Sequence, residues 1–203
     1  MISRYNYRDF TWIDLESPTP EETLHIAEEY NIPHHIADEL QSNTIRPKVE
    51  NTKNTLFLVL HFPSTAASTS RHKAYEIDFV IGKNFLITVH YEPVEALYEF
   101  SKTFEVSTIL DRDTRASNSG FVFSALIRAL YKNCLDELDT ITHTLNALER
   151  EIFATKEDIT IKHIATISKK ILDFRQATRS HAEILKSFST TSVALFGEEY
   201  RET

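Results

Sequence analysis

Several residue types are scarce in this chain, and their scarcity excludes particular classes of protein. Among 203 residues there are only one cysteine, three glycines and six prolines. Cys134 alone cannot form an intrachain disulfide, which suits a reducing compartment. Three glycines are too few to build a nucleotide-binding loop, and neither a Gly-x-Ser-x-Gly motif nor a Cys with a suitably placed His is present. We therefore expect a protein without enzymatic activity.

Long hydrophobic runs and basic residues are scarce as well. No run of 18 or more apolar residues occurs, so these residues do not cross a bilayer by themselves. The first residues lack the apolar centre of a secretory signal. Lys and Arg number 22 against 30 Asp and Glu, which gives a formal charge of −8. Because nucleic-acid binding depends on clustered basic residues, this balance argues against a nucleic-acid partner and favours cations as ligands.

Apolar residues make up 41% of the chain, and in the first half they fall into patterns typical of strands. The run Leu56–Leu60 is apolar on both alternating faces, which predicts a strand in the middle of a sheet that is covered on two sides. Residues 77–81 and 85–90 flank Gly82-Lys83-Asn84 and predict a β-hairpin. Thr11–Leu15 alternates as a half-buried strand does.

Helices are expected between these strands. Thr19 followed by Glu22 has the spacing of a capping box, which predicts a helix start. Leu24, Ala27 and Tyr30 are expected on the inward face of this helix. A short second helix is expected over residues 34–41.

After residue 119 the apolar residues recur at alternating spacings of three and four, which is typical of long helices. The first seam consists of Tyr131, Cys134, Leu138, Ile141, Leu145, Leu148 and Ile152, and the second of Ile164, Ile167, Ile171, Phe174, Thr178, His181, Leu185 and Phe188. Only residues 154–158 separate the seams, so the two helices are expected to fold back antiparallel. Each would be roughly 50 Å long, which is too long to lie wholly on the sheet.

These patterns together predict an α+β fold. A mixed β-sheet flanked by helices, an α/β/α sandwich, is expected over residues 1–117. A long antiparallel helical hairpin, leading toward a further stalk helix, is expected over residues 118–203. Because the hairpin projects, it is expected to find a partner.

Several segments resemble, in their order and spacing, landmarks of one protein family. They are Arg46-Pro47-Lys48-Val49-Glu50, the segments 76–82 and 84–90, Leu126-Ile-Arg-Ala-Leu130 and the stretch 175–185. On these residues the chain resembles the cytoplasmic domain of the CorA family of magnesium transport proteins. The likeness extends from about Trp12 to Phe196.

The resemblance implies that this chain is the cytosolic sensing and gating domain of a divalent cation channel. Magnesium is the expected ion, with cobalt and nickel as further candidates. The resemblance also implies a homopentamer at the cytoplasmic face of the inner membrane, held there by two C-terminal membrane helices that carry a Gly-Met-Asn signature. Neither helix is present in these residues, so the chain is expected to be the cytosolic part of a longer protein.

The sharpest candidate site is the adjacent carboxylate pair Asp38 and Glu39, because carboxylate oxygens are the ligands that magnesium prefers. The resemblance places an acidic pair here in a regulatory cation site between neighbouring subunits. The first long helix of the family can supply a further acid, and the matching residues here are Lys132, which would repel a cation, and Asn133, whose carbonyl could still bind one. The acids of residues 198–202 could supply another ligand. Weak, millimolar binding of regulatory magnesium is therefore expected.

Two other interpretations of the same residues are open, besides the one in which Asp38 and Glu39 are ordinary solvated residues on the surface of their helix. His34 with Asp38, and His35 with Glu39, stand four residues apart and could chelate zinc, cobalt or nickel, as in a regulatory domain of a zinc-transporting relative. No Cys pair or His-x-x-x-His motif accompanies them. The other reading is a soluble interaction module whose projecting hairpin docks a partner protein, with no ion function.

Overall fold

The computed structural model describes residues 1–44, 46–52, 54–64, 74–110, 118–153 and 157–196. The described strands are β1 (Ile2–Tyr7), β2 (Phe10–Glu16), β3 (Lys48–Asn51), β4 (Leu56–Pro63), β5 (Ala74–Ile81) and β6 (Phe85–His90). The described helices are α1 (Pro20–Glu29), α2 (His34–Glu39), α3 (Glu95–Ile109), α4 (Ser119–Phe153), α5 (Glu157–Thr178) and α6 (His181–Phe196).

The strands form one mixed sheet in the order β1-β2-β6-β5-β4-β3. Strands β2 and β6 pair in parallel, and every other described pair is antiparallel. The predicted strand over 56–60 and the predicted hairpin at residues 82–84 are confirmed. Strands β1 and β3 were not expected. Both lie at an edge of the sheet, where a strand pairs with a neighbour on one side only.

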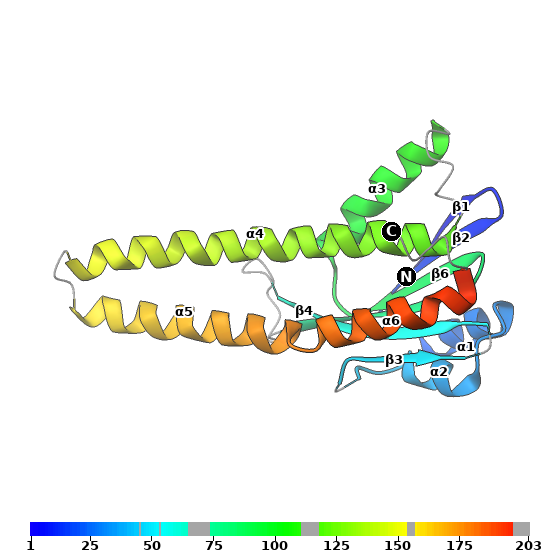
Figure 1. Cartoon of the computed structure of the whole chain (residues 1–203), viewed down its shortest axis with the longest axis horizontal. Coiled ribbons are helices and arrows are strands. Elements are labelled where there is room, and N and C mark those ends of the chain that lie inside the picture. Colours follow the sequence, from blue (N-terminus) through cyan, green and yellow to red (C-terminus); the bar gives the residue numbers. More distant parts are fainter. Residues whose placement is uncertain (45, 53, 65–73, 111–117, 154–156, 197–203) are drawn as a thin grey trace.

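Helices cover both faces of the sheet, so the predicted α/β/α sandwich is confirmed (Figure 1). The two faces of β4 show why. Leu58 and Leu60 pack toward α3, α4 and α6, whereas Phe57 and Val59 pack toward α1 and α2. Because neighbouring side chains of a strand point to opposite faces, a strand that is apolar throughout needs a helical layer on each side.

The capping box that starts α1 is present. The Glu22 backbone N–H donates to Thr19 Oγ1 at 3.2 Å, and Glu22 Oε2 accepts the Thr19 N–H at 2.8 Å. The expected inward face is confirmed at Ala27, which is 3% exposed, and wrong at Leu24, which is 40% exposed, because Thr23 and Ile26 complete the buried face. Tyr30 is half-buried at the edge of this layer, where its ring packs on the ring of Phe85.

The hairpin is present, but its second arm is not one continuous helix. Helix α5 ends at Thr178 and α6 starts at His181, so the arm bends at residues 179–180 (Figure 1). Three side-chain bonds accompany the bend. The Thr178 hydroxyl donates to the Phe174 carbonyl one turn back at 3.0 Å, a contact that often bends helices. His181 contacts Tyr131 of α4 and the backbone carbonyl of His61 in β4.

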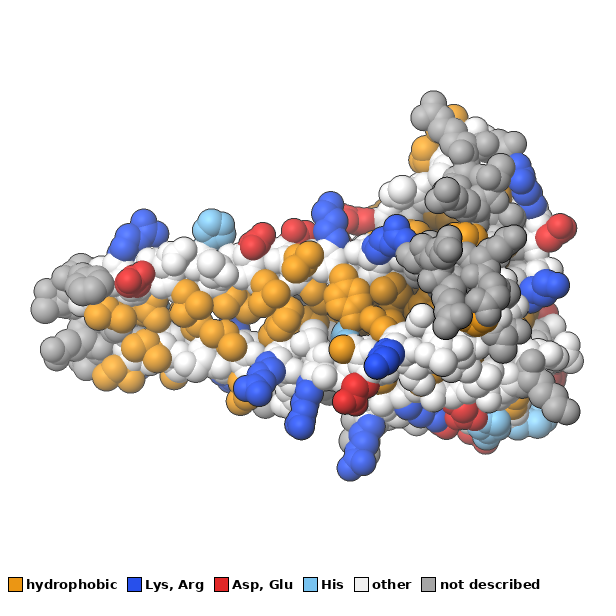
Figure 2. Space-filling view, viewed as in Figure 1, with side chains coloured by type: hydrophobic (Ala, Val, Ile, Leu, Met, Phe, Trp, Pro, Cys, Tyr) orange, Lys and Arg blue, Asp and Glu red, His pale blue; other side chains and the backbone are white. Residues whose placement is uncertain are grey.

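The base of the hairpin belongs to the core of the sandwich, while its outer part carries only a small cluster of Ile141, Leu148 and Ile167. Leu145 and Ile171 remain 40% and 43% exposed there. Figure 2 shows hydrophobic side chains in a band along the hairpin between its two arms. Residues 111–117, at the predicted boundary between the two domains, lie outside the described residues, so the division into 1–117 and 118–203 stays a prediction.

Leu126 and Leu135 lie on the same helix, α4, and test this division of the hairpin. Leu126 is fully buried and Leu135 is 60% exposed. We expect Leu126→Ala to lower the free energy of unfolding by about 2–5 kcal/mol, because it leaves a cavity in the core. The same change at Leu135 should cost less than about 0.5 kcal/mol. Urea denaturation followed by circular dichroism measures both, and a loss at Leu126 as small as that expected at Leu135 would show that the base of α4 is not part of the core.

Candidate cation site

Helix α2 presents the predicted acidic pair on its outer side. Ile36 and Ala37 are fully buried against the sheet, so the residues that follow them point outward. Asp38 is exposed and Glu39 is half-buried. The Tyr91 hydroxyl donates to the carbonyl of Leu40 at 2.9 Å, at the end of α2. This bond satisfies a terminal carbonyl of the helix and fixes its end above the sheet.

Glu39 already has a cationic partner. Lys48 Nζ lies 2.7 Å from Glu39 Oε1 and 2.6 Å from Glu39 Oε2. The same ammonium lies 3.3 Å from Glu50 Oε2, and His35 Nε2 lies 2.6 Å from Glu50 Oε1. The Lys48 ammonium also sits 5.0 Å from the centre of the Phe57 ring, in cation–π range. The ammonium of Lys48 therefore stands where a metal ion bound to Glu39 would stand.

The pKa shifts in this group follow from these contacts. Burial disfavours the charged form of Lys48, but the hydrogen bonds and charges of Glu39 and Glu50 outweigh it and raise the pKa of Lys48. The hydrogen bond from His35 is the largest cause of the lowered pKa of Glu50, with Lys48 adding to it against the effect of burial. Lys48 is therefore charged at neutral pH. Glu39 and Glu50 share one ammonium, and Asp38 adds an exposed carboxyl group on α2, so the edge of α2 stays acidic.

Asn133 does not lie near the acidic pair within one chain. It is half-buried on α4, in the helical layer on the opposite face of the sheet from α2. A site that joins it to Asp38 and Glu39 would need two chains, and it stays a prediction. Glu198, Glu199 and Glu202 lie outside the described residues. Within the described ranges, no three His, Cys, Asp or Glu side chains come together to hold a metal ion.

Of the two histidine–carboxylate pairs that could chelate zinc, one has other partners and the other is exposed. His35 contacts Glu50 rather than Glu39, and Glu39 contacts Lys48. His34 and Asp38 are both exposed on α2. A zinc ion held by His35 and Glu39 would therefore have to displace both of these ion pairs, whereas His34 and Asp38 lie outside them.

A second acidic group lies under the loop that follows α2, and sequence analysis missed it. Glu76 is buried and accepts the Thr44 backbone N–H with both carboxylate oxygens, at 2.9 and 2.8 Å. His61 Nε2 lies 2.9 Å from Glu76 Oε2. Burial and the neighbouring Glu76 raise the pKa of the fully buried Asp78 well above its ordinary value. The available signal was the alternation of Glu76 and Asp78 with apolar residues on β5, since both lie on a face that is covered.

These groups line a cavity of about 230 Å³ between the loop after α2 and the sheet. His61, Glu76 and Tyr91 contribute to its wall. The hydrogen-bonding capacity of Glu76 is largely taken up by Thr44 and His61, so its first role is to hold the loop.

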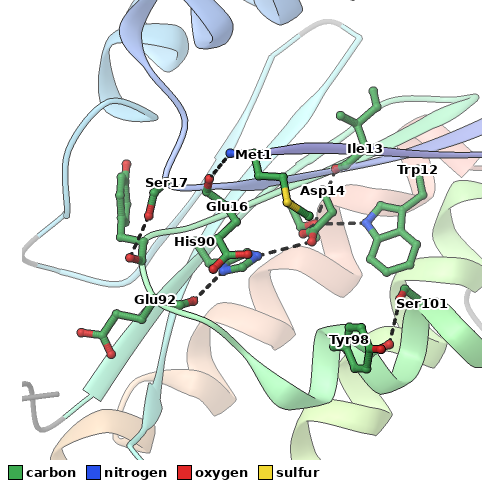
Figure 3. Close-up of polar contacts among 12 residues, drawn as sticks. Met1, Trp12, Ile13, Asp14, Glu16, Ser17, His90, Glu92, Tyr98 and Ser101 are labelled. Atoms are coloured by element: carbon green, nitrogen blue, oxygen red, sulfur yellow. Dashed lines mark hydrogen bonds and ion pairs between the residues drawn. The ribbon is translucent and has the colours of Figure 1, made fainter. Parts of the chain in front are cut away.

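A third polar group lies at the carboxyl ends of the parallel strands β2 and β6 (Figure 3). The Trp12 indole N–H donates to Thr88 Oγ1 at 3.1 Å, and the Thr88 hydroxyl donates to Asp14 Oδ1 at 2.5 Å. His90 Nε2 lies 3.4 Å from Asp14 Oδ2, and His90 Nδ1 lies 2.6 Å from the Glu92 carbonyl. Burial opposes the charge on His90, but Asp14 and the Glu92 carbonyl outweigh it and raise the pKa of His90.

The comparisons with known proteins agree on the fold. A sequence model of the family described as CorA-like Mg2+ transporter protein matches residues 7–202. No curated protein sequence matches the chain. The complete CorA magnesium transporter from Methanocaldococcus jannaschii is 18% identical with a TM-score of 0.79, and the match covers 98% of this chain and 61% of that one. Full-length CmaX is 13% identical with a TM-score of 0.78, covering 95% and 58%.

A cytoplasmic domain of ZntB from Vibrio parahaemolyticus RIMD 2210633 is 18% identical, with a TM-score of 0.73 over 96% of this chain and 76% of that one. The fold is thus shared with the soluble domain of CorA and the cytoplasmic domain of ZntB. The chain itself belongs to the CorA-like Mg²⁺ transporter family. It spans about three fifths of the length of the full-length proteins. None of the described helices has the length and apolar character that a membrane crossing requires.

His90 and His181 should make opposite contributions to the pH dependence of stability. The pKa of His90 is raised, so its stabilising effect is full below the unfolded pKa of about 6.5 and disappears as pH rises through its folded pKa. Burial is the main cause of the lowered pKa of His181, so its contribution disappears as pH falls below about 6.5. We expect His90→Gln to destabilise more at pH 5.5 than at pH 8, and His181→Gln to do the reverse.

Urea denaturation at both pH values measures these differences. The two single variants serve as controls for each other, because each keeps the other histidine. The assignment of both histidines would be wrong if the two difference curves had the same sign of slope.

Proposed function

We propose that this chain is the cytosolic sensing and gating domain of a divalent cation channel that transports magnesium, with cobalt and nickel as further ions. It acts without enzymatic chemistry. The parent protein works as a homopentamer at the cytoplasmic face of the inner membrane, held there by a C-terminal membrane segment. Family membership and the CorA soluble-domain fold support the proposal.

The observation that carries the proposal is the acidic outer edge of α2. Asp38 is exposed beside Glu39, and the fold holds both at the surface, because Ile36 and Ala37 anchor the other side of the helix. Mg²⁺ keeps several of its waters in most protein sites and needs only one or two carboxylates. An edge of this kind, completed by Asn133 from a neighbouring chain, suits weak regulatory binding.

Lys48 sets the magnesium concentration at which this site is filled. A cation reaches Glu39 only by displacing the Lys48 ammonium, which then keeps Glu50 as a partner. The ion pair is partly exposed, and such pairs contribute little net stability, so millimolar Mg²⁺ can compete with it. Cations bound between subunits at high cytosolic concentration would favour the closed, symmetric assembly, and their loss would release it.

Magnesium should stabilise the chain through Asp38 and Glu39. With a dissociation constant of about 1 mM, about 10 mM MgCl₂ adds roughly 1.4 kcal/mol to the free energy of unfolding. This corresponds to a rise of about 3–5 °C in the unfolding midpoint. We expect Asp38→Asn with Glu39→Gln to abolish the rise, and Lys48→Met to shift the response to about tenfold lower magnesium. Calorimetry at constant ionic strength measures the midpoints.

The matched control is Glu21→Gln with Glu28→Gln, which removes two exposed charges from α1 and should leave the magnesium response unchanged. The site assignment fails if the Asp38 and Glu39 variant responds as the wild type does. The same titration with CoCl₂, NiCl₂ and ZnCl₂ tests the other ions. A larger response to zinc that is lost with His34→Gln and His35→Gln would favour a zinc-transporting relative.

The exposed band on the hairpin favours a second candidate function, an interaction module that docks a partner protein. Leu145 and Ile171 lie on the outer hairpin and are 40% and 43% exposed, on seams of which Cys134, Ile141, Leu148, Ile167 and Phe188 are buried. This reading needs no metal ion. A wild-type midpoint that does not move with any of the four cations would therefore favour it over the sensing domain.

A further inference from the structure

A chain of polar contacts runs from the bend of the hairpin through the sheet to the loop behind α2. It starts at His181, the first residue of α6, whose side chain is 3% exposed. His181 Nε2 lies 2.8 Å from the backbone carbonyl of His61, which can only accept a hydrogen bond. Nε2 therefore carries the proton. In the neutral ring Nδ1 is then an acceptor, and the Tyr131 hydroxyl donates to it at 2.7 Å.

The sheet leaves this carbonyl available to α6. Strand β3 pairs with β4 only from Leu56 to Val59, so the outer backbone of β4 beyond Val59 has no described strand beside it. On its inner side His61 pairs with Glu76 of β5. A buried backbone carbonyl needs a donor, and His181 supplies it. Phe62 packs edge-on against the His181 ring at 5.2 Å and keeps the ring in place.

The side chain of His61 continues the chain of contacts on the other face of the sheet. Its Nε2 lies 2.9 Å from the Thr44 carbonyl and 2.9 Å from Glu76 Oε2, and both of these atoms are acceptors. Nε2 of His61 therefore donates to the loop after α2 and to Glu76. Glu76 in turn holds the Thr44 N–H with both oxygens.

Thr44 is close to the acidic pair along the chain. The turn between them is fixed by two backbone bonds, from the Gln41 N–H to the Asp38 carbonyl and from the Ser42 N–H to the Glu39 carbonyl, both at 3.3 Å. A displacement of the loop at Thr44 is thereby passed to the end of α2. The members of the chain are buried or half-buried, so water cannot cheaply replace a broken contact.

We propose that His181 and His61 are positioning residues that tie the bend of the hairpin to helix α2, and that through this tie the angle of the hairpin sets the position of Asp38 and Glu39. The link is mechanical, because a backbone carbonyl separates the two rings and passes no proton. A role of this tie in regulating the acidic pair rests on the proposed function, but the tie itself can be tested without any metal ion.

Hydrogen exchange of the Thr44 amide in the full chain tests the tie. His181→Phe keeps an aromatic ring against Phe62 but removes both hydrogen bonds. We expect the Thr44 amide to exchange about tenfold faster in this variant, which is the equivalent of one lost hydrogen bond. The Phe79 amide, in the middle of the sheet, reports global unfolding. The expected result is a faster rate at Thr44 that exceeds any change at Phe79.

Two further variants separate the tie from a loss of packing. His181→Gln keeps a donor for the His61 carbonyl and should restore most of the protection at Thr44. Ser192→Ala removes a fully buried hydroxyl of α6 that donates to the Ser189 carbonyl of the same helix, and it should leave Thr44 unchanged. If His181→Phe does not fold, Tyr131→Phe is measured instead, with a smaller increase of about threefold expected.

Equal acceleration at Thr44 and Phe79, or none at either, would overturn the inference. The magnesium titration separates this failure from failure of the proposed function. If the wild type responds to MgCl₂ and His181→Phe responds at the same concentration, the acidic pair works without the tie. If the wild type does not respond, the sensing role fails, while exchange at Thr44 still decides whether the tie exists.

Discussion

Strand β4 is buried on both of its faces, and this constraint places the rest of the structure. Its alternate side chains face two separate cores, one built with α1 and α2 and the other with α3, α4 and α6. The apolar side chains of each face must be covered, because burial of apolar surface stabilises the fold by roughly 25 cal/mol per Å². The acidic helix and the hairpin are therefore fixed on opposite sides of the same strand. A single residue of that strand, His61, contacts elements of both layers, through its ring on one side and its carbonyl on the other.

The acidic edge of α2 is not an open site. Lys48 of β3 holds Glu39, and β3 itself lies at the edge of the sheet beside β4. In the proposed cation site, a divalent cation would meet a preformed competitor, and its affinity would reflect the difference between the metal contacts and the ion pair that they replace. Such a competitor would suit an ion that is present at millimolar concentration, because a tighter site would be filled at all times. Asp38 is the exposed residue of the pair.

The features of the fold that could be predicted from the sequence are those set by residues close together in the chain. The run of β4, the hairpin between β5 and β6, the capping box of α1 and the seams of the long helices all depend on neighbouring residues. The bend at residues 179–180 was missed because Phe174, Thr178 and His181 keep the seam spacing of three and four across it. The Glu39–Lys48 ion pair joins two elements, so no local pattern contains it. Carboxylate chemistry and the family resemblance singled out the acidic pair, whose role in cation binding stays a prediction, whereas the position of Asn133 across the sheet follows only from the fold.

The most direct test of the account is sedimentation velocity of the chain with and without MgCl₂ at constant ionic strength. If the α2 edge binds cations between neighbouring subunits, magnesium should shift the wild type toward larger species and leave the Asp38→Asn, Glu39→Gln variant unchanged. An identical distribution for the wild type at every magnesium concentration, or an equal shift in the variant, would contradict it.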